Sequence, residues 1–284
     1  MENDIAGLLK GVEGLITLPH VYLRINALIE DPDSTMDDIA KAVGQDPSFT
    51  VRLLRLANSP YYGFASKIDT ANKAVSIIGT SQIRNLALSM SVASSFEGLP
   101  NELVSMENFW RHSLYCALIA RQLARLGKGC DSEAVFTAGL LHDIGELIIF
   151  NRLPELARES LLLVQDQVDD LPVYLAERQV IGYDHAEVGG KLASQWGLPP
   201  LLIECIAHHH DIENARQYPR ETALVHLANI IAQMVELDTL QTGDVSPFDP
   251  QAWLITGLKP ELIEAVVTEA RLEITEVEKL FFGN

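Results

Sequence analysis

Apolar residues recur every three or four positions along most of this chain, which is the spacing of one face of an α-helix. The pattern is clear in MDDIAKAV (36–43), SFTVRLLRLAN (48–58), HSLYCALIARQLARL (112–126), HAEVGGKLASQW (185–196), TALVHLANIIAQMVEL (222–237) and PELIEAVVTEARLEI (260–274). No segment alternates apolar and polar residues as a half-buried strand would, and no repeat of fixed period is present. The sequence therefore predicts an all-α, multi-helix fold.

Charge and composition exclude several classes of protein. A net charge of −18 repels phosphate backbones and anionic lipid surfaces, so nucleic acid is not expected as the main partner. The three cysteines form no CxxC pair, which favours buried thiols in a reducing compartment. No apolar run reaches the roughly 18 residues of a membrane span, and the acidic N-terminus does not resemble a signal peptide. We expect a cytoplasmic protein without membrane contact.

The histidines are distributed unevenly. Of the eight, only His20 precedes residue 112, and a loop-rich break over residues 94–108 separates the two regions. A second break, rich in Gly, Pro, Asp and Ser, covers residues 240–250. Any metal-binding or catalytic site built from histidines is therefore expected after residue 108.

Residues 139–150, GLLHDIGELIIF, place His142 and Asp143 side by side within an apolar stretch. A buried, unpaired carboxylate is costly, and a divalent metal ion removes that cost while taking the lone pair of the imidazole. The alternative is a buried His–Asp hydrogen bond without a metal. The dipeptide alone does not decide between them.

Three other segments supply imidazoles at helices or helix ends. They are WRHS (110–113), GYDHAEVGG (182–190) and IAHHHDIE (206–213). Taken singly, His112 reads as a core histidine, His185 as a surface residue in the first turn of a helix, and the HHH run as a solvated helix end. Taken together, the segments favour one metal site with imidazole and carboxylate ligands, which suits Fe, Mn, Ni, Co or Zn.

The order H…HD…H…HH resembles the HD superfamily of metal-dependent phosphohydrolases. Nearly the whole chain is similar to the HDOD domain, the HD-related output domain of bacterial signalling. The resemblance rests on QDPSFTVRLLRLANS (45–59), KAVSIIGTSQIRNLAL (73–88), WRHS, GLLHDIGEL, DHAEVGGKLASQWGLP (184–199) and the I-x-x-HH pattern from Ile206. It implies an N-terminal helical lobe over residues 1–106 and an HD-type lobe over residues 107–284.

The resemblance also implies a ligand set for one or two divalent transition-metal ions per chain. His112, His142 and Asp143 match the core ligands, and His185, His209 and His210 match a second metal position. His208 is then a bystander. At the last ligand position the superfamily has Asp, whereas this chain has Asn229, a neutral and weaker ligand.

Two functions follow as expectations, and no residue is assigned a catalytic role. The favoured one is a metal-binding output module of bacterial signal transduction, with signalling proteins as partners and a nucleotide or phosphate as ligand. The alternative is a phosphohydrolase acting on a nucleotide or cyclic-dinucleotide phosphoester. Against it stand Asn229, the lack of a GYP motif, and Glu146 where the related HD-GYP enzymes carry Lys. Arg111 and Lys191 are the only cations near the motifs. Glu146 could be a base that supports the ligands, but the plainer interpretation is a solvated helix residue.

The sequence pattern of residues 34–60 is also compatible with a helix-turn-helix, with one short helix ending at Gly44 and the next starting at Asp46-Pro47. In that alternative Ser48, Thr50, Arg52 and Arg55 would face a DNA groove. Equal numbers of acidic and basic side chains and a largely apolar second helix favour a packed helical subdomain instead.

Overall fold

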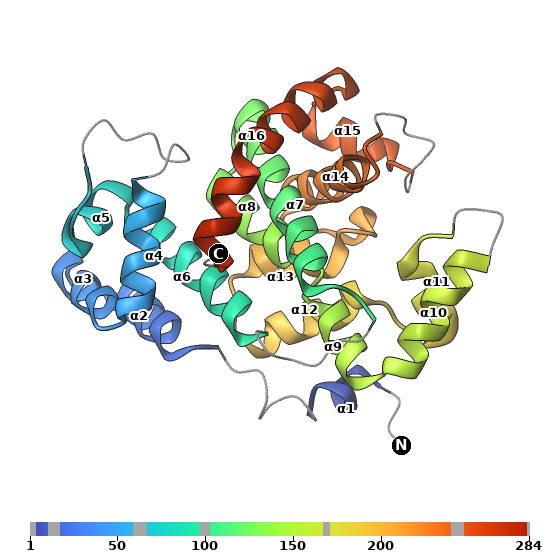
Figure 1. Ribbon diagram of the computed structural model, residues 1–284, viewed down its shortest axis with the longest axis horizontal. Helices are drawn as coiled ribbons and strands as arrows, with labels where there is room; N and C mark the ends of the chain where they lie inside the picture. Colours follow the sequence, from blue (N-terminus) through green and yellow to red (C-terminus); the bar gives the residue numbers. More distant parts are fainter. Residues whose placement is uncertain are drawn as a thin grey trace. The chain divides into compact units, whose positions relative to one another are not determined.

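The computed structural model describes residues 4–10, 18–58, 67–96, 103–166, 171–239 and 247–282 (Figure 1). Every regular element in these ranges is a helix, which confirms the predicted all-α class. Contacts divide the chain into two compact units, one of Met1–Leu15 with Gly98–Ala270 and one of Ile16–Glu97 with Arg271–Asn284. The division into lobes of residues 1–106 and 107–284 stays a prediction.

The smaller unit is built from short amphipathic helices around an aliphatic core. They are α2 (His20–Glu30), α3 (Met36–Gly44), α4 (Pro47–Ala57), α5 (Ala71–Ile78) and α6 (Thr80–Ser95). Helix α2 packs on α3 and α6, and α5 packs on α3 and α4. Ile25 of α2, Val43 of α3 and Leu53 of α4 are fully buried, each on the apolar face of its amphipathic helix.

Helices α3 and α4 occupy the segment with the helix-turn-helix cadence. The Asp46 carboxylate accepts a hydrogen bond from the Phe49 amide at 2.8 Å, and Pro47 opens α4. The Thr50 hydroxyl donates to the Val43 carbonyl at 2.7 Å, so this side chain ties α4 to α3. DNA binding stays an untested alternative.

The larger unit holds the histidine-rich segments. Its α-helices are α1 (Ile5–Lys10), α7 (Met106–Gly127), α8 (Ser132–Leu141), α9 (Ile144–Arg152), α10 (Pro154–Asp166), α11 (Val173–Val180), α12 (His185–Gln195), α13 (Pro200–His208), α14 (Pro219–Glu236) and α15 (Pro250–Thr256). Short 3-10 turns span Ile212–Asn214 and Pro260–Leu262, and α16 (Ile263–Phe282) runs from this unit into the other. None of the described helices has the length and hydrophobicity needed to cross a membrane.

Helix α7 forms the centre of this unit and packs against both α8 and α14 (Figure 1). Its apolar residues from Leu114 to Ala124 are buried. Because α8 and α14 flank α7, the helix with His112, the end of α8 that precedes His142 and the helix with Asn229 are held side by side.

Glycines let three further helices approach closely, with α12 packed between α9 and α13. A Cβ atom on Gly145 of α9 would overlap the backbone carbonyl of His185 and lie 2.7 Å from the Gly189 nitrogen. A Cβ atom on Gly190 would lie 3.0 Å from the Cα atom of Ala207 on α13. These close contacts bring the end of α8, the start of α12 and the end of α13 to one place.

Candidate metal centre

His142 and Asp143 form the junction between two buried helices. Helix α8 ends at Leu141 and α9 begins at Ile144, so the pair lies in a turn and not within one continuous helix. The His142 side chain is fully buried and that of Asp143 is 10% exposed. The turn brings His142 Nε2 to 2.9 Å from Asp143 Oδ2.

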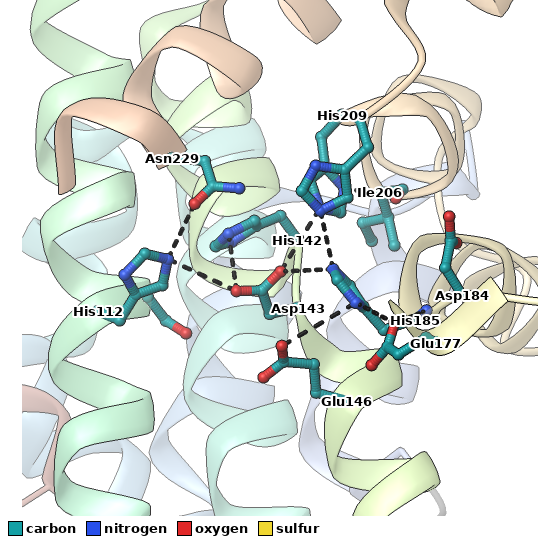
Figure 2. Close-up of polar contacts among 12 residues, drawn as sticks. His112, His142, Asp143, Glu146, Glu177, Asp184, His185, Ile206, His209 and Asn229 are labelled. Atoms are coloured by element: carbon teal, nitrogen blue, oxygen red, sulfur yellow. Dashed lines mark hydrogen bonds and ion pairs between the residues drawn. The ribbon is translucent and has the colours of Figure 1, made fainter. Parts of the chain in front are cut away.

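Asp143 lies at the centre of a group of histidines from four segments (Figure 2). Its Oδ2 atom faces His142 and also lies 3.5 Å from His112 Nε2. Its Oδ1 atom lies 3.4 Å from His185 Nε2 and 3.5 Å from His209 Nε2. The two oxygens of one carboxylate therefore face two different pairs of imidazoles.

The inner histidines are oriented by their own helices. His142 Nδ1 donates to the Gly139 carbonyl at 2.8 Å, and His209 Nδ1 donates to the Ile206 carbonyl at 2.9 Å. A carbonyl only accepts, so Nδ1 of each ring carries a proton. The Nε2 atom of each ring is thereby left facing Asp143.

The outer histidines are oriented by carboxylates. His112 Nδ1 lies 3.2 Å from Glu236 Oε1, and His185 Nδ1 lies 2.7 Å from Glu177 Oε2. Pairing of a ring nitrogen with a carboxylate is the usual support for a metal-binding histidine. Neither glutamate could be predicted from the sequence, because neither lies in a motif with its histidine and helical spacing alone does not connect them.

The remaining predicted residues each extend one side of the group. Asn229 Oδ1 lies 3.1 Å from His112 Nε2, and His210 Nε2 lies 3.0 Å from His185 Nε2. All the predicted ligand residues thus meet at one site: His112, His142, Asp143, His185, His209, His210 and Asn229. His208 lies apart from them in a second hollow, beside Lys191.

Burial and mutual contact set the protonation of this group. Burial would raise the pKa of Asp143, but His142, His185 and His209 outweigh it and hold the pKa well below the usual range. Burial and the neighbouring imidazoles hold the pKa of His210 well below its ordinary value. Asp143 is therefore ionised and His210 neutral, which are the forms that coordinate metal ions.

The outer histidine His112 behaves differently. Burial would lower its pKa, but the carboxylates of Glu236, Asp143 and Glu146 raise it to about 9. For Glu146, burial and the charge of Asp143 raise the pKa to about 8. A cation bound among these groups would displace the His112 proton and take over its pairing with the carboxylates.

The atoms that face one another suit a divalent cation. His142 Nε2, Asp143 Oδ1 and His209 Nε2 are buried and have no hydrogen-bond partner. Potential ligand atoms lie within 4.8 Å of one another in three sets: His112, His142 and Asp143; Asp143, His185, His209 and His210; and Glu146, Glu177 and His185. Imidazole nitrogens with one shared carboxylate fit a transition metal.

The group forms the floor of a cavity of about 790 Å³. Apolar side chains make up most of its walls: Leu103, Val104, Phe109, Val164, Leu171, Pro172, Val173, Tyr174 and Leu237.

Glu146 also lines the cavity and its side chain is only 19% exposed, so its interpretation as a solvated helix residue is wrong. No lysine or arginine is found among the described residues that line the cavity. Arg111 instead lies 3.9 Å from Glu107.

Two solved structures resemble the whole chain. One is an HDOD domain protein of unknown function from Geobacter sulfurreducens, with a TM-score of 0.77 and 27% identity over 98% of this chain and 97% of that one. The other is a candidate phosphohydrolase from Shewanella amazonensis SB2B, with a TM-score of 0.75 and 27% identity over 97% of this chain and 98% of that one.

A curated relative and the family profile agree with these structures. An uncharacterised protein of Treponema pallidum (strain Nichols) is 27% identical over 82% of this chain, which spans only 45% of that protein's length. The profile of the HDOD domain matches residues 15–212, which include every predicted ligand except Asn229. The chain therefore belongs to the HDOD domain family.

Proposed function

We propose that this HDOD chain binds one or two divalent transition-metal ions through Asp143 and the histidines around it. The observation that carries the proposal is the position of Asp143, whose two oxygens face separate pairs of imidazoles. His112, His142 and Asn229 would hold one ion with Oδ2. His185, His209 and His210 would hold the other with Oδ1.

The activity that this arrangement supports best is hydrolysis of a phosphoester. Metal ions held there would polarise a phosphoryl oxygen and lower the pKa of a water molecule. The chain itself supplies a cavity with largely apolar walls and a carboxyl group, that of Glu146, beside the ligands. Glu146 Oε1 lies 3.9 Å from His185 Nδ1, where it can take up or return a proton.

The charge of the cavity favours a phosphodiester over a phosphomonoester. A monoester carries nearly two negative charges at neutral pH and a diester carries one. Asp143, Glu146 and Glu236 line the cavity, and no lysine or arginine among the described lining residues balances a second charge. One more charge about 4 Å from a carboxylate costs roughly 4 kcal/mol at an effective dielectric constant of 20. The substrate class we propose is thus a nucleotide or cyclic-dinucleotide phosphodiester.

We expect the protein loaded with Mn²⁺ to hydrolyse bis(p-nitrophenyl) phosphate with a kcat/KM at least ~10-fold above that for p-nitrophenyl phosphate. Cyclic and linear dinucleotides extend the comparison to natural diesters. The His209→Ala variant should lose the activity, whereas His208→Ala should keep it, since His208 lies outside the ligand group. A preference for the monoester would refute the substrate class.

Restoring a carboxylate at position 229 should strengthen the ion position beside His112. In Asn229→Asp an anionic oxygen would replace the amide oxygen that lies 3.1 Å from His112 Nε2. Gln233 Nε2, 3.5 Å from that oxygen, can donate to either side chain. We expect affinity for Mn²⁺ at this position to rise roughly 10-fold, measured by calorimetric titration. Unchanged affinity would mean that Asn229 is not a ligand.

A signalling output module is the second candidate function. The neutral Asn229 and the lack of a lysine or arginine among the described cavity residues favour binding without turnover. In that case the loaded protein would bind a nucleotide or phosphate ligand, leave it intact, and act through signalling proteins. Product analysis of the same diester panel separates the two candidates.

A further inference from the structure

Three residues on one face of helix α11 contact the histidine group or the residue that precedes His185. Tyr174, Glu177 and Arg178 are spaced at i, i+3 and i+4, so their side chains share that face. Each of them meets a different residue at the site: His210, His185 and Asp184, respectively. None of the three belongs to the predicted ligand set.

The strongest of these contacts is made by Glu177. One carboxylate oxygen, Oε2, accepts from His185 Nδ1 at 2.7 Å and from the His185 backbone amide at 2.9 Å (Figure 2). Both side chains are almost completely buried, at 2% and 3% exposed. A charge-assisted bond in a dry environment is strong, and here it fixes the rotation of the ring as well as the place of its backbone. Nε2 of His185 is thereby directed at Asp143.

Tyr174 and Arg178 act on the neighbours of His185. The Tyr174 ring stacks on His210 with centroids 4.2 Å apart and planes at 10°. Arg178 pairs with Asp184 at 2.8 Å, and Asp184 in turn caps α12 by accepting from the Glu187 amide at 2.9 Å. The first residue of α12 is His185. The start of α12 and the ring of His210 are thus both held from α11.

We propose that α11 is the positioning element of the second ion position, with Glu177 and Tyr174 as the positioning residues for His185 and His210. This inference rests on the proposed metal binding. The first ion position does not depend on α11, because His112 is oriented by Glu236 from α14 and His142 by its own helix. The two halves of the site can therefore be weakened separately.

The test compares Glu177→Ala with its mirror variant Glu236→Ala, in the full chain, by calorimetric and Co²⁺ spectroscopic titration. Glu177→Ala should weaken the second position ~10–100-fold and leave the first unchanged, and Glu236→Ala should do the reverse. Glu177→Gln should fall between wild type and alanine, because an amide oxygen still accepts from Nδ1.

Tyr174→Phe should keep wild-type binding, whereas Tyr174→Ala should weaken the second position. Exposed Glu213 gives a control, Glu213→Ala, expected to match wild type.

A second readout needs no metal. The proton on His185 Nδ1 should give a strongly deshielded imidazole resonance in the metal-free protein, lost in Glu177→Ala and kept in Glu236→Ala. If this selective loss is seen but wild type binds no ion, the metal proposal fails while the positioning role of Glu177 stands. If Glu177→Ala keeps the resonance, or fills both positions as wild type does, the role of α11 is refuted.

Discussion

The Asp143→Ala variant is expected to lose metal binding at both positions at once. Among the described residues, Asp143 is the only one shared by the set of potential ligand atoms around His112 and the set around His209. Its Oδ2 atom faces His112 and His142, and its Oδ1 atom faces His185 and His209. Its removal takes away the sole carboxylate of each of these sets, and with it the group that faces all four imidazoles. We expect apparent affinity for Mn²⁺ or Zn²⁺ to fall at least ~100-fold, measured by equilibrium dialysis with elemental analysis.

Two further variants make this result specific. Asp143→Asn keeps the shape of the side chain and one oxygen, so it should retain more metal than alanine but less than wild type. His208→Ala removes an imidazole adjacent in sequence to the group but not part of it, and should bind as wild type does. Full metal content in Asp143→Ala would place the ions elsewhere or remove Asp143 from the ligand set.

The Gly145→Ala variant is expected to be destabilised and to lose metal although it changes no ligand. Its Cβ atom would overlap the backbone carbonyl of His185 and lie 2.7 Å from the Gly189 nitrogen, and backbone atoms cannot rotate away. Helices α9 and α12 would therefore have to separate, moving Asp143 away from His185. We expect a loss of about 3 kcal/mol, or roughly 6–12 °C in Tm, measured by chemical and thermal unfolding.

Gly44→Ala is the matched control for a glycine replaced within a helix. A Cβ atom at Gly44 would meet nothing within 4 Å. We expect this variant to be as stable as wild type or more stable by about 0.4–1 kcal/mol, because alanine restricts the unfolded chain. A Gly145→Ala protein with unchanged Tm and metal content would show that α9 and α12 need not be in such close contact.

The fold class could be predicted because helical periodicity is a local property. Five of the six periodic segments lie within observed α-helices or extend one residue beyond them, and the sixth, residues 260–274, begins in the 3-10 turn Pro260–Leu262 and continues in α16. The residues at which helices end were harder to predict where two helices meet in the core. The turn at His142 and Asp143 interrupts a stretch that is apolar throughout, so hydrophobicity does not mark the end of α8.

The histidines of the site could be found because they lie in short motifs, and the structure brings all of them together. Glu177 and Glu236 could not, because their importance comes from tertiary contact with His185 and His112. The same reason explains Glu146, which lies in the first turn of α9 and would be solvated on an isolated helix. Its burial follows from the packing around the cavity.

The measurement that tests the central claim most directly is elemental analysis of untagged wild-type protein purified without chelators, alongside Asp143→Ala. We expect one or two transition-metal ions per chain in the wild type and a small fraction of that in the variant. Two ions would favour the phosphohydrolase. No metal in the wild type, even after incubation with Mn²⁺, Fe²⁺, Co²⁺, Ni²⁺ or Zn²⁺, would contradict the account and leave the histidine group without a bound ion.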